Sequence, residues 1–329
     1  MDEEIRAAQK KIDKERDALE RLRAEVGKVI VGQTDMVNKI IIGLLAGGHL
    51  LIEGVPGLAK TLTVSTFAQA LSLPFNRIQF TPDMLPADLV GTMVYNQKTG
   101  EFQVKKGPLF SAVILADEIN RAPAKTQSAL LEAMQERQVT IGDKSYILDP
   151  AFIVIATQNP IEQHGTYPLP EAQVDRFMMK LRLEYPSREE EVGILRVHGS
   201  GTAPRISPVV ARADLEHAKK TLHEIYMDEK VERYIVDLVA ASRNPEGFEL
   251  VEIKDLIAFG ASPRASLFLK TGAKANAFLN GRGYVIPDDV RDIGYEVLRH
   301  RLILTYEAQA EDITPEDVIG KIFSGVEVP

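Results

Sequence analysis

The stretch Gly54-Val55-Pro56-Gly57-Leu58-Ala59-Lys60-Thr61 decides the fold of this chain. It follows Leu50-Leu51-Ile52, a short apolar run typical of a buried parallel strand. It precedes a segment in which apolar residues recur at helical spacing, among them Leu62, Val64 and Phe67. A strand, a glycine-rich turn and a helix N-terminus in this order predict a loop whose main-chain N–H groups bind phosphate.

The side chains of this loop favour a nucleotide as the phosphate ligand. Lys60 is expected to reach the β- and γ-phosphates, and the Thr61 hydroxyl to bind Mg²⁺. The pattern G-x-x-x-x-G-K-[ST] is broken once, because Ala59 stands where a second glycine is expected. We expect alanine to be tolerated there only if its φ stays below zero. The alternative interpretation is a glycine-rich turn followed by an incidental Lys-Thr pair.

The composition narrows the class of protein. With 329 residues the chain is long enough for two domains, and 45% apolar and 26% charged residues are ordinary for a soluble protein. The lack of cysteine excludes disulfides, thiolate metal sites and a cysteine nucleophile, and it fits a reducing, cytoplasmic location. We expect no membrane segment, because no apolar run approaches the roughly 18 residues that span a bilayer. The acidic start Met1-Asp2-Glu3-Glu4 is unlike a secretory signal. A net charge of -8 argues against nucleic acid as the main partner.

The first two parts of the chain are an N-terminal helix and an α/β core. In residues 1–28, apolar side chains recur every seven positions at Ile5, Ile12, Leu19 and Val26, which predicts a long amphipathic helix. Between residues 29 and 184, strand-like and helical segments alternate, which predicts an α/β fold with helices on both faces of a parallel sheet. We expect strands at 50–53, 77–81, 112–116, 152–156 and 178–183, and helices at 33–47, 60–71 and 123–136.

Two inserts interrupt the alternation, and a second domain follows it. Residues 92–106 and 138–148 each predict a β-hairpin around a glycine turn. Two interpretations stay open for each hairpin: it is exposed to solvent and has no specific function, or it contacts a partner. Residues 185–212 contain proline, glycine and a run of glutamates, which predicts a linker. Residues 213–329 show helical patterns with almost no strand signal, so we expect a small all-helical domain there.

Polar residues follow two of the predicted strands. Asp117 and Glu118 end an apolar run, and at the carboxyl end of a parallel strand they are placed to act on a ligand. Asp117 is expected to hold Mg²⁺ through water, and Glu118 to orient or deprotonate an attacking water. Asn159 follows the next strand, where its amide is expected to hydrogen-bond the γ-phosphate. Both roles have an alternative: Asp117 and Glu118 are acidic residues exposed to solvent at a strand end, and Asn159-Pro160 only initiates a turn.

Five motifs in this order resemble an AAA+ ATPase of the MoxR type, within the helix-2-insert clade. The motifs are Lys60-Thr61, Asp117-Glu118, Asn159, the segment 169–177 and Ser262-Pro263-Arg264. The runs 54–61, 116–123 and 165–173 are close to the MoxR pattern, in which alanine at position 59 is usual. The resemblance covers about residues 15–325 and implies a P-loop core with a helical lid domain.

The resemblance also implies roles for single residues. Asn159 matches the sensor-1 position, and Arg176 matches the arginine finger, which reaches the γ-phosphate of a neighbouring subunit. Arg264 matches sensor 2 in the helical lid. Val31-Gly32-Gln33 match the stretch that lines the adenine pocket, and Leu62 completes the nucleotide-binding set after the loop. Without this context, Arg176 is a surface ion pair and Arg264 a surface residue of a first helical turn.

The function implied is that of a Mg²⁺-dependent ATP hydrolase that binds ATP and ADP in a homo-oligomeric ring, usually a hexamer. Such rings remodel or mature a client protein, often beside a partner with a von Willebrand factor A domain. The insert at 92–106 matches the helix-2 insert and 138–148 the pre-sensor-1 hairpin. Two other functions stay open: a nucleic-acid or chelatase-type motor, and a nucleotide-gated scaffold with little turnover. The acidic balance argues against a motor on DNA, and Glu118, Asn159 and Arg176 together argue against a scaffold.

Overall fold

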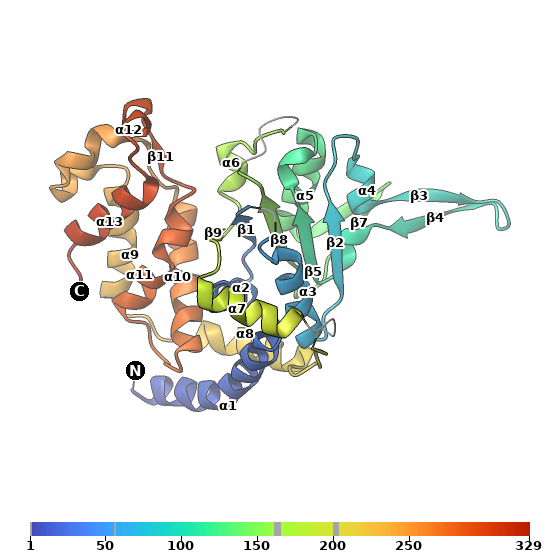
Figure 1. Cartoon of the computed structure of the whole chain (residues 1–329), viewed down its shortest axis with the longest axis horizontal. Coiled ribbons are helices and arrows are strands. Elements are labelled where there is room, and N and C mark those ends of the chain that lie inside the picture. The colour runs from blue at the N-terminus through green and yellow to red at the C-terminus, as the bar shows by residue number, and fades with distance from the viewer. Residues whose placement is uncertain (1, 56, 161–165, 200–203) are drawn as a thin grey trace. The chain divides into compact units, whose positions relative to one another are not determined.

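The computed structural model describes residues 2–55, 57–160, 166–199 and 204–329, with the main chain alone at 2–8. These residues form two compact units, and their elements are labelled in Figure 1. The first, which we call the core unit, comprises Glu20–Arg176 and Leu181–Arg212. The second, which we call the helical unit, comprises Met1–Leu19, Phe177–Lys180 and Ala213–Pro329. The helical unit is therefore assembled from three separate segments of the chain.

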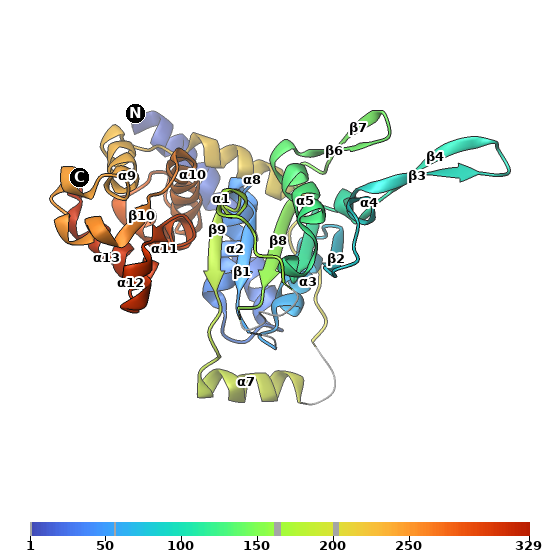
Figure 2. The same cartoon turned by 90° about the horizontal axis from the view of Figure 1, so that it is seen from above.

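A five-stranded sheet with the order β2-β5-β8-β1-β9 forms the centre of the core unit (Figures 1 and 2). Strands β2 and β5, β5 and β8, and β8 and β1 pair in parallel. All of β5 is buried, as expected for a strand covered on both faces. The predicted parallel α/β fold is confirmed. The five strands are β1 (Leu50–Glu53), β2 (Phe75–Gln79), β5 (Val113–Asp117), β8 (Ile153–Gln158) and β9 (Met179–Arg182).

Helices α2 (Thr34–Ala46), α3 (Lys60–Ala70) and α5 (Ala124–Glu136) agree with the three helices predicted for the core. Each buries an apolar face; in α3, Val64 and Phe67 are fully buried. Such a face, more than intrinsic propensity, stabilises a helix of this length. The short helices α4 (Pro86–Val90) and α6 (Glu171–Val174) are additional.

Both predicted hairpins are present as two-stranded antiparallel sheets. The first consists of β3 (Gly91–Asn96) and β4 (Glu101–Lys106), and Figure 2 shows it extending away from the central sheet. Tyr95 and Phe102 pair across it with ring centroids 5.3 Å apart, although both side chains are exposed. The second hairpin consists of β6 (Gln138–Ile141) and β7 (Lys144–Ile147).

The helical unit is confirmed as mainly helical. Its main helices are α8 (Arg212–Glu224), α9 (Glu229–Ala241), α10 (Pro263–Leu279), α11 (Pro287–Leu298), α12 (Tyr306–Ala310) and α13 (Pro315–Gly325). The sequence pattern missed a two-stranded antiparallel sheet of β10 (Ile257–Phe259) and β11 (Ile303–Leu304). Strands this short carry too few alternating positions to be distinguished from loops.

The N-terminal helix is present as predicted, whereas the linker differs from the prediction. Helix α1 (Asp2–Gly27) is one helix, but its first part clusters with the helical unit and its last part with the core unit. Ile12, Leu19 and Val26 are buried as the sevenfold spacing predicts, whereas the side chain of Ile5 lies outside the described residues. The predicted linker 185–212 contains helix α7 (Arg188–His198), which the prediction did not include.

Helix α7 begins at a capping box that explains its formation. The Glu190 N–H donates to Ser187 Oγ at 3.3 Å, and the Ser187 N–H donates to Glu190 Oε2 at 2.7 Å. These bonds satisfy two main-chain donors that the first turn otherwise leaves unpaired. The same bonds lower the pKa of Glu190, with the main-chain bond as the largest cause. The glutamates that suggested a linker therefore form the first turn of a helix.

Candidate active site

The phosphate-binding loop lies between the end of β1 and the start of α3, as predicted. Gly57 has a φ of +88°, which glycine adopts without strain. A Cβ on Gly54 would lie 3.0 Å from the Leu183 Cβ, so a larger residue would crowd the loop. The Thr61 side chain is half-buried at the first turn of α3. Pro56, which we expected in the loop, lies outside the described residues.

Lys60 folds back onto its own loop. Its Nζ donates a hydrogen bond of 2.7 Å to the Gly54 carbonyl oxygen. Burial lowers the pKa of Lys60, and the negative charges of Asp117 and Glu118 oppose this effect. The ammonium group of Lys60 is thus partly desolvated near two carboxylates. Burial disfavours its charged form, and the negative charge of a bound phosphate would stabilise that form.

Ala59 contradicts the expectation of a negative φ. It is the N-cap of α3 with a φ of 53° and a ψ of 20°, in the left-handed region. A non-glycine residue there costs roughly 1–2 kcal/mol. The Ala59 carbonyl oxygen accepts bonds from the Thr63 N–H at 2.9 Å and from the Thr63 Oγ1 at 3.1 Å. The expectation was wrong because the turn into α3 sets this φ whichever residue stands there.

The strand order brings the predicted polar residues to one edge of the sheet. Strands β5, β8 and β1 are neighbours and run in parallel, so their carboxyl ends meet there. The loop follows β1, Asp117 and Glu118 stand at the end of β5, and Asn159 follows β8. The Gly54 N–H donates to the Gln158 carbonyl oxygen at 3.3 Å, which ties two of these strand ends together.

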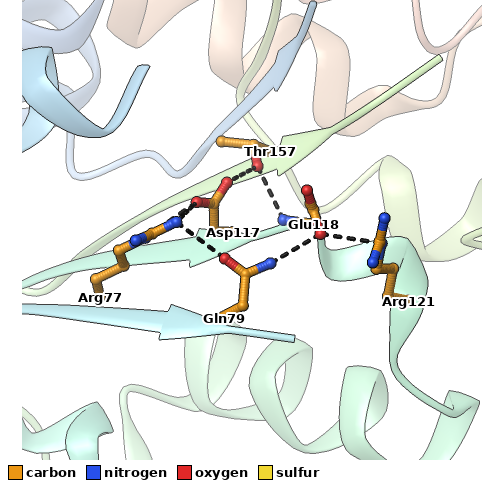
Figure 3. Close-up of polar contacts among 6 residues, drawn as sticks. All are labelled: Arg77, Gln79, Asp117, Glu118, Arg121 and Thr157. Carbon is orange, nitrogen blue, oxygen red and sulfur yellow. Dashed lines mark hydrogen bonds and ion pairs between the residues drawn. The ribbon is translucent and has the colours of Figure 1, made fainter. Parts of the chain in front are cut away.

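Asp117 is buried and held by neighbours on both sides (Figure 3). Its Oδ1 accepts a bond of 2.6 Å from Thr157 Oγ1, and its Oδ2 accepts one of 2.7 Å from Arg77 Nη2. Both oxygens are therefore engaged by the protein, which fits a carboxylate that reaches a metal through bridging water. Among the described residues no group of three or more His, Cys, Asp or Glu forms a metal cage. Such a sparse set suits Mg²⁺, which usually binds one or two carboxylates plus substrate phosphates.

Glu118 projects from a strained turn directly after β5. Its φ is 56°, and its N–H donates to Thr157 Oγ1 at 2.9 Å. Gln79 Nε2 donates to Glu118 Oε2 at 2.8 Å, and Arg121 Nε lies 2.9 Å from the same oxygen (Figure 3). The carboxylate is thus fixed at a strand end by an amide and a guanidinium, as a group that orients or deprotonates water requires.

A cavity of about 250 Å³ adjoins the loop within the core unit. Gln33 connects its two sides, because its Nε2 donates to the Leu58 carbonyl oxygen at 3.0 Å. Gly32, which was predicted with its neighbours, is not among the residues that line the cavity; it has a φ of +73°, and a Cβ there would collide with Glu190. The mostly apolar walls suit a flat ring such as a purine. They are formed by Val29, Ile30, Val31 and Gln33, by Gly57, Leu58, Ala59 and Leu62, and by Pro186, Ile194 and His198.

Several residues of the site were missed from the sequence. Arg77 and Gln79 lie on β2, and their only signal was a run of polar residues in a strand of an otherwise apolar sheet. Ile194 and His198 lie on α7, and the His198 ring nitrogen Nε2 lies 2.9 Å from the Val29 carbonyl oxygen. They were missed because the segment was interpreted as a linker.

Comparison with known proteins agrees with this geometry. Residues 49–179 match the family described as "ATPase family associated with various cellular activities (AAA)", and residues 252–322 match the AAA lid domain. The chain is 48% identical to "Chaperone MoxR1" of Mycobacterium tuberculosis, over 94% of this chain and 82% of that protein. It is 43% identical to the uncharacterised protein YeaC of Bacillus subtilis, over 92% of each chain. A crystal structure of a putative ATPase from Cytophaga hutchinsonii superposes with a TM-score of 0.93 at 50% identity, over 99% of each chain.

The chain belongs to the MoxR-type AAA+ ATPases. The resemblance inferred from the sequence motifs is thereby confirmed, together with an AAA core and an AAA lid. MoxR-type ATPases are nucleotide-binding proteins, and the loop, the strand-end carboxylates and the apolar cavity of this chain fit that ligand. No helix in the described part of the chain is long and apolar enough to cross a membrane.

The two arginines predicted for this MoxR-type chain lie on other elements than the strand-end residues, because Arg176 follows α6 and Arg264 lies on α10. Arg176 is half-buried one residue before the core unit gives way to Phe177, and its N–H donates to the Gln173 carbonyl oxygen at 3.2 Å. Arg264 belongs to the helical unit, in the first turn of α10 after the N-cap Ser262. The core unit alone thus unites the loop, Asp117, Glu118 and Asn159.

Proposed function

We propose that the chain is a Mg²⁺-dependent ATP hydrolase that turns over in a homo-oligomeric ring, such as a hexamer, and remodels or matures a client protein. The observation that carries the proposal is the meeting of Gly54–Thr61, Asp117, Glu118 and Asn159 at one edge of the sheet. The name "Chaperone MoxR1" of a close relative supports the remodelling role. A partner with a von Willebrand factor A domain and a cytoplasmic location belong to the same proposal.

Each residue of the site has a distinct task in this reaction. Loop N–H groups and Lys60 bind the phosphates, and the apolar cavity binds the base. Mg²⁺ would supply positive charge on the phosphate oxygens, held by the Thr61 hydroxyl and by Asp117 through water. Glu118 takes a proton from the water that attacks the γ-phosphorus, and the bond between that phosphorus and ADP breaks. Asn159 orients the water and the γ-phosphate, so catalysis rests on positioning and charge.

The Glu118→Gln variant tests the proposed hydrolysis. Glutamine keeps the size of the side chain but does not accept a proton, so we expect phosphate release to fall by about 10²-fold or more. Binding of a fluorescent ATP analogue should stay within about twofold, because the loop and the cavity are unchanged. Glu53→Gln is the matched control, since Glu53 ends strand β1 of the same sheet and pairs with Arg182 at 3.4 Å instead. Unchanged phosphate release in Glu118→Gln would refute the catalytic role and favour a nucleotide-gated scaffold.

Mixed rings test whether one chain completes the site of another. Subunits with Arg176→Ala lack the proposed finger but keep the phosphate loop, and subunits with Lys60→Ala have the reverse defect. Mixing them should restore part of the ATPase activity, because some interfaces then pair an intact loop with an intact finger. Native mass spectrometry verifies that mixed assemblies form. If they form and activity stays at the level of the separate variants at every ratio, Arg176 does not act between subunits.

A further inference from the structure

The main chain directly after Arg176 is held by three consecutive basic side chains of the helical unit. Phe177–Lys180 is the short segment that this unit takes from the middle of the chain. Phe177, Met178 and Met179 are completely buried. Arg299, His300 and Arg301, which follow α11 and which we call the basic triplet, donate to carbonyl oxygens of this segment.

The Phe177 carbonyl oxygen receives two of these donors. His300 Nε2 lies 3.1 Å from it, and Arg301 Nη2 donates to it at 2.6 Å. Arg301 Nη1 also donates to the Met178 carbonyl oxygen at 3.2 Å, and the guanidinium of this buried side chain lies 5.1 Å from the Phe268 ring centroid. A buried guanidinium is held in place by such contacts, because losing one leaves a desolvated charge unsatisfied.

His300 acts as a donor in its neutral form. Burial lowers its pKa well below the usual value, and the positive charge of Arg301 acts in the same direction. A neutral ring with the proton on Nε2 donates to the Phe177 carbonyl oxygen, as the 3.1 Å distance requires. Its Nδ1 is buried with no hydrogen-bond partner among the described residues. Its polar contact with the segment is therefore the single bond to Phe177.

Arg299 holds the far end of the segment. Its Nη1 donates to the Lys180 carbonyl oxygen at 3.1 Å, and its Nε lies 3.0 Å from Glu316 Oε1 on α13. The basic triplet therefore forms hydrogen bonds to the main-chain carbonyl oxygens of Phe177, Met178 and Lys180. On the other side of Arg176, its own N–H is bonded to Gln173 after the turn of α6.

We propose that the basic triplet positions Arg176, by fixing the peptide that follows it, and so couples the arginine finger to the helical unit. This inference rests on the proposed function, in which Arg176 serves a neighbouring site. Arg176 is the last residue of a core segment, and the residue bonded to it is the first of a segment of the helical unit. Because Arg176 and Phe177 share one peptide bond, fixing the Phe177 carbonyl group also constrains Arg176, while Met179 and Lys180 belong in addition to β9 of the central sheet. Arg299, His300 and Arg301 are positioning residues and touch no substrate.

His300→Leu is the principal variant, because it removes the donor and keeps an apolar body of similar bulk. We expect kcat for ATP to fall about tenfold, within the range that a small misplacement of a catalytic group costs. The KM for ATP should stay within about twofold, since the loop and the cavity proposed to bind ATP are unchanged in every chain. His300→Gln, which restores an N–H donor, should recover at least half of the lost activity. Arg291→Gln is the matched control, because Arg291 donates to the Phe323 carbonyl oxygen within the same unit at 2.8 Å and should leave kcat unchanged.

A double-mutant comparison separates positioning from a general structural role. In an Arg176→Ala background, His300→Leu should cause no further loss of kcat, because the group that it positions is gone. A further loss of about tenfold in that background would overturn the inference while leaving the proposed function intact. Equal activities of His300→Leu and His300→Gln would also overturn it. If Arg176→Ala by itself keeps wild-type activity, the proposed role of Arg176 is wrong. The inference is then also wrong, and the single variant shows that the error lies in the role of Arg176.

Mixed rings provide a second measurement, namely how strongly one chain stimulates the ATPase activity of its neighbour. A folding defect in the active site of the stimulating chain does not affect this measurement, because that site is already inactive. Lys60→Ala subunits, which do not hydrolyse ATP themselves, should stimulate Arg176→Ala subunits by donating a finger. Adding His300→Leu to the donor should reduce that stimulation about tenfold, as in the kcat assay. Undiminished stimulation would contradict the inference. If melting curves show that His300→Leu does not fold, Arg299→Gln replaces it in both assays, since Arg299 grips Lys180 from a partly exposed position.

Discussion

At the scale of the residue, the backbone of the site departs from ordinary geometry at three non-glycine positions. Gln33, Ala59 and Glu118 have φ values of 38°, 53° and 56°. Gln33 joins the cavity to the loop, Ala59 turns the loop into α3, and Glu118 presents the proposed base. Left-handed backbone is costly for such residues and persists where the surrounding structure imposes it. At these three positions the strain fixes the directions of side chains or main chain that the proposed chemistry uses; Ser72, Arg137, Glu249 and Asp312 have positive φ elsewhere in the described chain.

Ala59→Gly should raise the free energy of unfolding by up to about 1 kcal/mol. Glycine relieves the left-handed strain of roughly 1–2 kcal/mol, and its greater freedom in the unfolded chain offsets part of the gain. Ala68→Gly in α3 is the control, and it should lose about 1 kcal/mol because a helix interior disfavours glycine. Urea unfolding of the chain without nucleotide measures both. A loss of stability in Ala59→Gly would contradict the assigned backbone geometry.

At the scale of the element, α7 links a local sequence signal to the nucleotide. Its capping box at Ser187 and Glu190 starts the helix, and one face of the helix brings Ile194 and His198 to the wall of the cavity. A helix of this length needs both the cap and a packed face to persist. The affinity of the chain for the base of a nucleotide should therefore depend on the hydrogen bonds between Ser187 and Glu190 at the N-terminal end of α7.

Ser187→Ala should weaken nucleotide binding about three- to fivefold, because loss of an N-cap costs about 1 kcal/mol and α7 must be ordered to complete the cavity. Thr314→Ala is the matched control. Thr314 caps α13 through a capping box with Asp317, so its loss costs similar stability with no contact to the cavity. Isothermal titration with ADP compares the two variants. Equal affinities would show that α7 stays ordered without its cap.

The capping box of α7 also predicts a pH dependence. The pKa of Glu190 is lowered in the folded chain by its bonds to Ser187, so the charged form is favoured in the folded state. The stabilisation is present above the unfolded pKa of a glutamate, about 4.3, and is lost as the pH falls through the lower folded value. Hydrogen exchange of α7 amides should therefore be slower in the wild type than in Glu190→Gln at pH 6. A difference that persists unchanged at pH 3 would contradict this origin.

At the scale of the whole molecule, the proposed function gives one chain two kinds of catalytic group that serve two different sites. The core unit unites the loop, Asp117, Glu118 and Asn159, while Arg176 stands where the chain passes from the core unit to Phe177 of the helical unit. The proposal that Arg176 completes a neighbour's site makes activity a property of the assembly. It also makes the helical unit part of the catalytic machinery through the basic triplet.

ATPase activity per chain should fall on dilution through the concentration at which the ring dissociates, because a separated chain lacks its neighbour's arginine. The Arg176→Ala variant should have low activity per chain at every concentration. Nucleotide binding per chain should not change, since the loop and the cavity belong to one core unit. Activity and sedimentation velocity are measured over the same concentration range. Constant activity per chain while the assembly dissociates would refute completion of the site between subunits.

The sequence by itself determined the nucleotide loop and the residues at the strand ends. Both follow from local pattern, since an apolar run, a glycine-rich turn and a helix start define Gly54–Thr61. In a parallel sheet, residues that follow the strands lie at the same edge, which was predicted for Asp117, Glu118 and Asn159; the strand order that makes β5 and β8 neighbours came from the structure. The hairpin at 92–106 was also predictable from local sequence, because a glycine turn between two segments of alternating polarity is sufficient to indicate it.

Only the tertiary structure decided the backbone of Ala59, the engagement of Asp117 by Arg77, and the place of α7 beside the cavity. It alone showed that the segment after Arg176 belongs to the helical unit and is gripped by the basic triplet. These features depend on contacts between residues far apart in the chain, and their energies do not appear in the periodicity of any one segment. The pattern therefore specified the groups that we propose bind and hydrolyse nucleotide, whereas long-range packing specified what holds them in place.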